Sequence, residues 1–391
     1  MQQKQIVVVG AGIVGLSTAY ALLKQGMKHV IVLEQATVDH KRATSHGLSR
    51  LLRFEYGDDA LYSQMVQLSL HRWKNLERAA RRTLYTRTGV LVLGKKDDNY
   101  TQPSYHLLRQ LGFSTEYISR QSCTQLFPQF NTDDYDIFTY NIDAGILHAS
   151  SCLHMLKEQI RDLGGCILEG QRVTRISHHN PHLPIRLQLQ SQDELQASRV
   201  VLATGPWVHR LLGDLQLPIR MTRQYILYYA NLPPSSFELH AFPAFLADDL
   251  YGFPIHSTCT GHGPSWFKGT SHTFGELIDP DETPRVDEQL IAEVSARLCH
   301  LIPALQSAKL VHVDTCMYDV SPDEHFILDY VPDDARIVFA SGLTGHGFKF
   351  GPLLGELLCS LVRETEPVVP MERFRLARLA QHSLVPVYSV A

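Results

Sequence analysis

Short apolar runs and glycines alternate over the first 34 residues of the chain. Residues 6–9 read IVVV, residues 10–15 read GAGIVG, and apolar residues then recur at helical spacing up to residue 23. A second apolar run, residues 30–33, ends at Glu34. We therefore predict a buried strand, a glycine turn, a helix and a second strand that ends in an acid.

The predicted order is the one that binds a dinucleotide. Gly10 permits a tight turn, Gly12 lets the backbone approach a pyrophosphate, and Gly15 lets the helix pack closely on the strand. Glu34 stands 19 residues after Gly15, where an acid contacts the ribose hydroxyls. The alternative, a membrane span or signal sequence over residues 6–23, disagrees with the three glycines and with the lack of a small-residue cleavage site.

A second glycine turn stands near the end of the sequence. Residues 337–340 form an apolar run that predicts a buried strand, and leucines at helical spacing follow the turn. The turn glycines and the leucines are Gly342, Gly345, Gly347, Leu353, Leu354, Leu357, Leu358 and Leu361. Because a helix N-terminus attracts negative charge, we expect an anionic or electron-rich group against residues 346–351.

The pattern between the two glycine turns changes several times. We predict helices at residues 62–76 and 287–299, and strands at residues 89–93, 164–169, 173–176, 185–189 and 197–208. The last of these strands contains Ala-Thr-Gly, where small residues let a cofactor lie against the backbone. Aromatic-rich strands are expected from residue 221 to about residue 308.

These elements predict an α/β fold with two interleaved domains. A discontinuous Rossmann-like domain takes residues 1–85, 150–215 and 310–391. An inserted substrate domain, an antiparallel β-sheet with helices, takes residues 86–149 and 216–309. The length of 391 residues agrees with this division because it exceeds one ordinary core.

Composition narrows the class of partner. The net charge is −4 with both signs spread along the sequence, so we predict a small-molecule partner and neither nucleic acid nor membrane. The seven cysteines are an odd number and form no CxxC pair, which favours a reducing, cytoplasmic location over a disulfide framework. His178, His179 and His182 flank an Asn-Pro pair, so we interpret them as a solvated turn and predict no metal site.

Six segments together resemble one known family. They are GAGIVG at residues 10–15, SHGLSRLLRFEYG at 45–57, YGFP at 251–254, HTFGELIDPD at 272–281, CMYDVSPDEHFILD at 316–329 and GLTGHGFKFG at 342–351. Over nearly its whole length the chain resembles the monomeric sarcosine oxidase and N-methyltryptophan oxidase family of FAD-dependent amine oxidoreductases, within the D-amino-acid-oxidase-like flavoproteins. The resemblance implies that the dinucleotide is FAD and that the Rossmann-like domain binds it.

The resemblance also implies a set of cofactor-binding residues. Cys316 stands where family members attach FAD through a thioether, although a lone cysteine is otherwise more often an inert core residue. Arg50 corresponds to an arginine at the flavin ring, with a structural ion pair as the alternative, and His346 could equally pack the turn. The implied set is Gly10, Gly12, Gly15, Glu34, Ser45, His46, Arg50, Cys316, Gly345, His346, Gly347 and Lys349.

A substrate site is implied in the same way. Arg53 and Lys349 correspond to two cations that hold the substrate carboxylate, a task that suits a guanidinium fork and a compact ammonium. Tyr251 and Tyr318 correspond to aromatic residues of the substrate pocket, although tyrosines are also common in cores.

The catalytic residues implied are Lys268 and His272, together with Arg50. Lys268 corresponds to a lysine that promotes the reaction with oxygen, because a positive charge stabilises superoxide. His272 corresponds to a substrate-site histidine. A structural role is the alternative for both.

The function that we predict is oxidation of a secondary or N-methylated amino acid to an imine, which hydrolyses, with hydrogen peroxide formed from dioxygen. We expect a monomer or a small homo-oligomer. Three alternatives stay open: a flavin dehydrogenase with another electron acceptor, a nicotinamide-dependent dehydrogenase, and a flavin-binding sensor without turnover. A longer loop at residues 257–265 and departures at Ser45, Phe54 and Glu55 leave the amine itself open.

Overall fold

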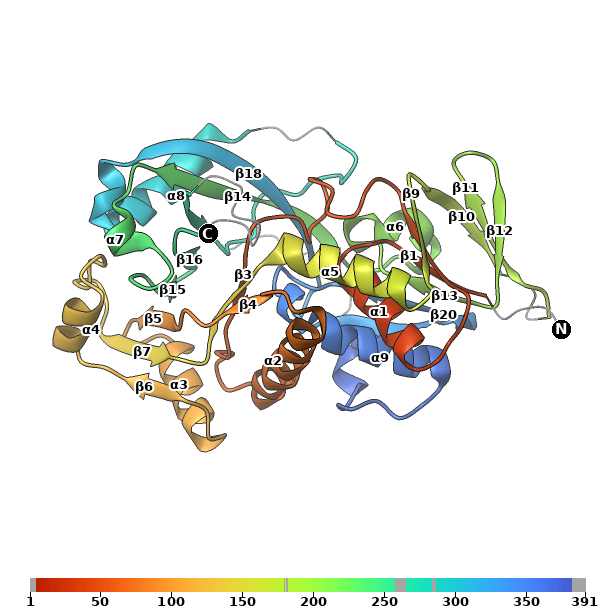
Figure 1. Ribbon diagram of the computed structural model, residues 1–391, viewed down its shortest axis with the longest axis horizontal. Helices are drawn as coiled ribbons and strands as arrows, with labels where there is room; N and C mark the ends of the chain where they lie inside the picture. The colour runs from red at the N-terminus through yellow and green to blue at the C-terminus, as the bar shows by residue number, and fades with distance from the viewer. Residues whose placement is uncertain (1–4, 179, 181, 257–264, 283–285, 382–391) are drawn as a thin grey trace.

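The computed structural model describes residues 5–178, 180, 182–256, 265–282 and 286–381 (Figure 1). Its first sheet has six strands in the order β19-β20-β13-β1-β2-β9. The strands are β1 (Ile6–Val9), β2 (Val30–Glu34), β9 (Cys166–Glu169), β13 (Arg199–Leu202), β19 (Ile327–Val331) and β20 (Asp334–Ser341). All neighbours pair in parallel except β19 with β20. The strands predicted at both glycine turns therefore lie in one sheet.

Both faces of this sheet are covered, which explains the continuous apolar runs of its strands. Ile6 and Val8 of β1 join the core formed with helices α1 (Ile13–Lys24), α5 (Ala149–Asp162) and α9 (Gly351–Arg363). Val7 and Val9 join a core on the other face with a three-stranded sheet. The strands of that sheet are β10 (Val173–Ser177), β11 (Ile185–Leu189) and β12 (Glu194–Ala197).

Helices α1 and α9 bring the two glycine turns together. A Cβ at Gly355 of α9 would lie 2.4 Å from the carbonyl carbon of Ser17 in α1, and one at Gly351 would lie 2.5 Å from Ile13. Such close approach needs glycine at the crossing. The N-termini of the two helices, about 340 residues apart in sequence, are thereby held at the same edge of the sheet.

The second large sheet has eight strands in the order β18-β14-β17-β16-β15-β5-β7-β6. The strands are β5 (Val90–Gly94), β6 (Thr115–Tyr117), β7 (Ile137–Asn141), β14 (Arg220–Ala230), β15 (Ala244–Ala247), β16 (Leu250–Phe253), β17 (Phe267–Ser271) and β18 (Lys309–Val320). Neighbours are antiparallel except the parallel pair β15 and β5. Many residues of the core in this half of the protein are aromatic, as their density in the sequence predicts.

Helices and a small sheet complete the fold. The small sheet pairs β3 (Arg50–Leu52), β8 (Gly145–Leu147) and β4 (Tyr85–Thr86). The helices besides α1, α5 and α9 are α2 (Ala60–Ala80), α3 (Thr101–Gln110), α4 (Arg120–Leu126), α6 (Val208–Leu211), α7 (Pro234–Phe237) and α8 (Glu288–Leu301). The carboxylates of Asp59 and Asp287 accept hydrogen bonds from the first turns of α2 and α8, which explains where these helices begin.

Two strands differ from the prediction. The strand expected at residues 197–208 ends at Leu202, because Gly205 adopts a φ of +50° and Pro206 opens a short 3-10 helix. The second is β18, within which Cys316 lies. β18 pairs with β14 in the eight-stranded sheet, although its residues stand at the start of the third predicted Rossmann-like segment. The domain boundaries stay a prediction.

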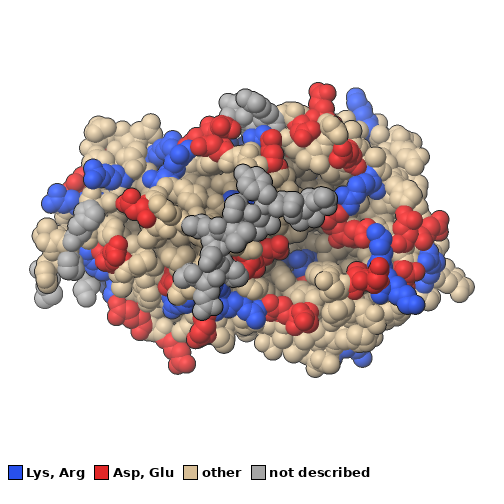
Figure 2. Space-filling model, turned by 180° about the vertical axis from the view of Figure 1, so that it is seen from behind, with Lys and Arg blue, Asp and Glu red and all other residues tan. Residues whose placement is uncertain are grey.

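Surface features are consistent with the mixed charge of the sequence. Lys and Arg side chains are interspersed with Asp and Glu on the face shown in Figure 2. Among the described residues, no helix combines the length and apolar character that crossing a membrane requires. His178 lies 3.5 Å from Asp334, whereas His179 is outside the described residues. The described part of the chain holds no cluster of His, Cys, Asp or Glu suited to a metal ion.

Candidate active site

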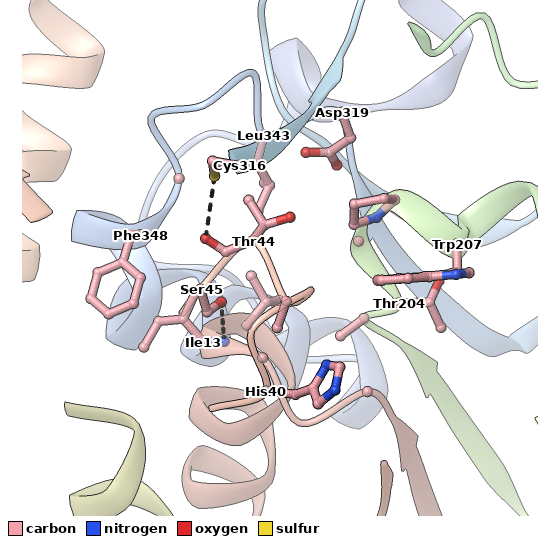
Figure 3. Close-up of a pocket in the computed structure, with 18 of the residues that line it drawn as sticks. Ile13, His40, Thr44, Ser45, Thr204, Trp207, Cys316, Asp319, Leu343 and Phe348 are labelled. Atoms are coloured by element: carbon pink, nitrogen blue, oxygen red, sulfur yellow. Dashed lines mark hydrogen bonds between the residues drawn. The ribbon is translucent and has the colours of Figure 1, made fainter. Parts of the chain in front are cut away.

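A cavity extends between the two large sheets, from Glu34 at the end of β2 to Cys316 in β18. It is lined by the turn between β1 and α1, the segment that contains Thr44, the residues after β13, and the turn before α9. Figure 3 shows side chains from all four segments pointing toward this space. The cavity therefore meets both glycine turns.

The glycine turn after β1 forms one end of the cavity. Gly10 has a φ of +102°, and a Cβ there would lie 2.3 Å from the carbonyl oxygen of Ala203. A Cβ at Gly15 would lie 1.9 Å from the carbonyl oxygen of Gly10, so this glycine permits the close packing of α1 on the turn. Ser45 Oγ accepts a hydrogen bond from the Ile13 N–H at 2.9 Å and so caps α1 (Figure 3).

Glu34 is held at the same end by the backbone. Its two carboxylate oxygens accept hydrogen bonds from the N–H groups of Ala11 at 2.8 Å and Ala36 at 3.0 Å. Each oxygen has a further lone pair. The carboxylate is thus positioned to accept bonds from ligand hydroxyls.

Cys316 lies at the other end of the cavity, close to two cations. Its Sγ is 4.0 Å from the carbonyl oxygen of Thr44 (Figure 3). Burial raises the pKa of the thiol, while the charges of Arg50 and Lys268 act in the opposite direction. The thiolate form of Cys316 is therefore more favoured than that of a cysteine buried among apolar groups.

The two cations make hydrogen bonds to carbonyl oxygens. Arg50 donates to the carbonyls of Thr44 at 2.8 Å, Ser49 at 2.9 Å and His46 at 2.5 Å, in place of the ion pair considered from the sequence. Lys268 donates from Nζ to the Ser49 carbonyl at 2.8 Å. Burial, and then the charge of Arg50, holds the pKa of Lys268 well below its usual value.

Three buried polar atoms around the cavity have no hydrogen-bond partner within the described protein: Thr44 Oγ1, Thr204 Oγ1 and Asp319 Oδ2. Figure 3 shows these residues around the cavity. Burial raises the pKa of Asp319 to about 6, although the N–H groups of Leu343 and Gly342 stabilise its charged form. Because buried polar groups rarely stay unpaired, these atoms indicate a ligand that carries hydrogen-bonding groups.

A second group of charged residues lies beside this cavity. Lys349 is buried, and its Nζ donates to the Tyr56 hydroxyl at 2.7 Å. The Arg53 guanidinium lies 4.4 Å from the centre of the Tyr56 ring and donates to the Glu55 carbonyl. Burial and the charge of Arg53 hold the pKa of Lys349 well below its usual value. The buried Lys349 amine and the half-buried Arg53 guanidinium therefore lie close together, on the same tyrosine.

Aromatic residues connect the cavity with these cations. The hydroxyls of Tyr251 and Tyr318, which both line the cavity, are 3.2 Å apart. The His272 ring lies 5.5 Å from the Tyr318 ring between centres. Burial, followed by the charges of Arg53 and Lys349, lowers the pKa of His272 to about 4. His272 is therefore neutral near pH 7.

The structure gathers most of the residues that we predicted, in two places. Those that line the cavity are Gly10, Gly12, Glu34, Ser45, Arg50, Tyr251, Lys268, Cys316, Tyr318, Gly345 and Gly347. Gly15 packs behind the turn, and His46 turns to Asp39, where their side chains are 2.8 Å apart. Arg53, Lys349, His272 and His346 are not among the residues that line the cavity, and the His272 ring lies against Tyr318. The loop at residues 257–265 falls, except Ser265, outside the described residues.

Several site residues were absent from the sequence prediction. Thr204 belongs to the Ala-Thr-Gly segment and Asp319 follows directly on the CMY motif, so position in a motif could have indicated both. Tyr56 also lies in a motif segment, but nothing in the sequence places its hydroxyl beside Lys349. Trp207 lines the cavity and has no signal of its own in the sequence.

Comparisons with known proteins agree with this geometry. Residues 5–361 match the family described as FAD dependent oxidoreductase. The chain belongs to this family. It is 33% identical to the peroxisomal sarcosine oxidase of Mus musculus over 383 residues, which cover 96% of each chain. It is 27% identical to the N-methyl-L-tryptophan oxidase of Salmonella arizonae, with 96% and 99% of the two chains covered.

Solved structures show the same fold. The L-proline dehydrogenase from P. horikoshii superposes with a TM-score of 0.84 at 19% identity, covering 98% of this chain and 99% of that one. This likeness confirms the predicted α/β fold, and the family match together with the identity to sarcosine oxidase confirms the predicted family.

The cavity fits FAD. Its glycine turn and capped helix N-terminus suit a pyrophosphate, and Glu34 suits a ribose. Thr44, Thr204 and Asp319 would find in a hydroxyl-bearing cofactor the partners that the protein does not give them. Gly10, Gly12, Ser45 and Glu34 would hold the adenine half, and the residues around Cys316 the redox-active half.

Proposed function

We propose that the chain is an FAD-dependent oxidase of a secondary or N-methylated amino acid. The observation that supports this best is the pair of basic side chains at the end of the cavity, the buried Lys349 and the half-buried Arg53, which both lie against Tyr56. Two basic side chains so close together suit a carboxylate, which the guanidinium can bind with two parallel hydrogen bonds. The sarcosine and N-methyltryptophan oxidases named above act on amino acids with an N-methyl group.

Each residue has a task in this proposal. Arg53 and Lys349 hold the carboxylate, while Tyr251 and Tyr318 flank the amine and exclude water. The chemistry that FAD would supply when bound is an acceptor for the two electrons of the substrate C–H bond, which then go to dioxygen. Lys268 supplies positive charge where negative charge develops on dioxygen. The imine hydrolyses in water, and hydrogen peroxide is the second product.

The carboxylate assignment is tested with matched ligands. Arg53→Met should raise the KM of an N-methyl amino acid by about 10-fold or more, because a charge-assisted bond is lost. The KM of the same amine without its carboxylate should change little. The conservative variant Arg53→Lys should recover part of the affinity. Equal effects on both amines would contradict the assignment.

The reaction type is tested by peroxide yield. A panel of N-methyl and cyclic amino acids should include one that gives one peroxide for each amine oxidised in air. Bleaching of the yellow colour without peroxide in air would favour the dehydrogenase. No bleaching by any amine would overturn the proposal.

We also propose that Cys316 attaches the cofactor covalently. The Sγ–C bond would replace the thiol S–H and one C–H of a cofactor methyl group, with the two electrons released to dioxygen through the cofactor. Acid-denatured protein should stay yellow, and Cys316→Ser should release the colour. Cys166→Ser, a change at an exposed cysteine far along the chain, is the control. A cytoplasmic location and a monomeric or small homo-oligomeric state stay predictions from the sequence.

A further inference from the structure

Lys349 is the start of a directed chain of hydrogen bonds. It is 4% exposed, and both hydrogen bonds of its Nζ go to uncharged oxygens, the Tyr56 hydroxyl at 2.7 Å and the His346 carbonyl at 3.2 Å. The Tyr56 hydroxyl in turn lies 3.1 Å from His346 Nδ1. His346 Nε2 lies 3.3 Å from the carbonyl oxygen of Glu324.

The partners fix the direction of each bond. A backbone carbonyl only accepts, so His346 Nε2 carries the proton and Nδ1 is the acceptor. Tyr56 must therefore donate its proton to Nδ1, which leaves its oxygen free to accept from Lys349. All three bonds point from the buried amine toward His346, which is partly exposed, and Glu324, which is exposed.

The oxidation requires that the substrate amine first lose a proton. An amino acid arrives with its amine protonated, and an ammonium cannot release the electrons of its C–H bond until it loses a proton. A carboxylate beside Lys349 strengthens the hold of this side chain on a proton. In the site without substrate, burial and the charge of Arg53 favour its neutral form.

We propose that Lys349 takes the proton of the substrate ammonium and that Tyr56 and His346 carry this proton to the surface. The inference rests on the proposed amine oxidation. The step balances: the ammonium N–H breaks, Lys349 becomes an ammonium, and the amine is neutral when it is oxidised. After product leaves, Lys349 passes a proton to Tyr56 while Tyr56 passes its own to His346, and water takes the proton on Nε2.

Other titratable groups surround the relay. They are Arg53, Glu55 and Tyr56 after β3, Tyr62 in α2, Tyr100 before α3, His272 after β17, and Glu324 and His325 before β19. Arg53 lowers the pKa of Lys349 and Glu55 raises it, and burial raises the pKa of Glu55 itself. Burial, followed by the charges of Lys349 and Arg53, disfavours a proton that stays on His346, so the proton moves on to water.

Tyr56→Phe tests the relay because it removes one oxygen atom. Anaerobic reduction of the bound cofactor by substrate should keep its first-turnover rate within about threefold, since Lys349 starts neutral. Steady-state turnover at neutral pH should fall about tenfold or more, because Lys349 keeps the proton. Higher pH and added imidazole should restore the rate. His346→Gln should behave in the same way.

Tyr62→Phe is the matched control. Its ring stacks on Tyr56 with centres 5.0 Å apart, but its hydroxyl accepts from the Phe326 N–H, outside the relay. If Tyr56→Phe and His346→Gln have the steady-state rate and pH profile of Tyr62→Phe, the relay is wrong while the oxidase stands. If Tyr56→Phe does not fold, His346→Gln alone decides. If no amine reduces the wild-type cofactor, both proposals fall.

Discussion

Alanine at Gly345 perturbs the position of the Tyr318 ring in a way that can be worked out from the structure. Gly345 has a φ of +71°, a conformation that costs any other residue about 1–2 kcal/mol. The added Cβ would lie 2.3, 2.5 and 2.6 Å from three atoms of the Tyr318 ring, which is 4% exposed. Overpacking of this kind costs about 1–3 kcal/mol. The sum is a loss of about 2–5 kcal/mol in the free energy of unfolding.

Two other glycines separate the cost of the left-handed backbone conformation from the cost of the contact with the Tyr318 ring. Gly164 has a φ of +82° with nothing within 4 Å of its Cβ position, so Gly164→Ala should lose only about 1–2 kcal/mol. Gly213 has open space and no left-handed φ, so Gly213→Ala should change little. Urea unfolding followed by circular dichroism measures all three. A loss in Gly345→Ala no greater than that in Gly164→Ala would refute the steric reasoning.

The same variant has a second readout at the site. A displaced Tyr318 ring breaks the 3.2 Å contact between the hydroxyls of Tyr318 and Tyr251. The KM of the amino acid should therefore rise in Gly345→Ala and stay unchanged in Gly164→Ala.

Three further predictions concern titratable groups of the cavity. The pKa of Asp319 is about 6 in the folded protein, against 3.8 for an ordinary aspartate. Its protonated form therefore stabilises the fold fully below about pH 4, and this stabilisation is lost as pH rises through about 6. The free energy of unfolding should fall by about 3 kcal/mol over this range. Urea unfolding of the cofactor-free Asp319→Asn variant at pH 4 and pH 6 should not show this fall in stability. If the variant shows the same fall as wild type, Asp319 is not its cause. His272 has a pKa of about 4 and is neutral above about pH 6. His272→Gln should therefore not change the pH dependence of amine oxidation above pH 6, and a change in that range would contradict this reasoning. Because the pKa of Lys268 is lowered, this side chain loses its charge as pH rises, and reoxidation of the reduced cofactor in wild type should slow with pH in stopped-flow experiments. In Lys268→Met, reoxidation should be about 10²-fold slower and should not depend on pH. If the variant keeps the pH dependence, another group causes it.

The strand, glycine turn and helix at each end of the chain follow from the order of the residues alone. Residues 6–9 and 337–340 lie in β1 and β20, because an apolar run with β-branched residues is typical of a strand in a parallel sheet that is covered on both faces. The motif segments also predicted which side chains gather near the cavity. These features are local, since spacing along the chain is enough to express them.

The tertiary structure alone decided how those side chains act. The strand expected to reach residue 208 stops at Leu202, because Gly205 and Pro206 form a turn that opens toward the cavity. Cys316 meets Lys268 because β18 and β17 both pair with β14, and it meets Arg50 because β3 of the small sheet comes close to this sheet. The hydroxyl of Tyr56 reaches both Lys349 and His346 across about 290 residues of sequence. Burial and neighbouring charges set the protonation state of each side chain. Both depend on distances between residues that are far apart in the sequence, and the sequence does not give these distances.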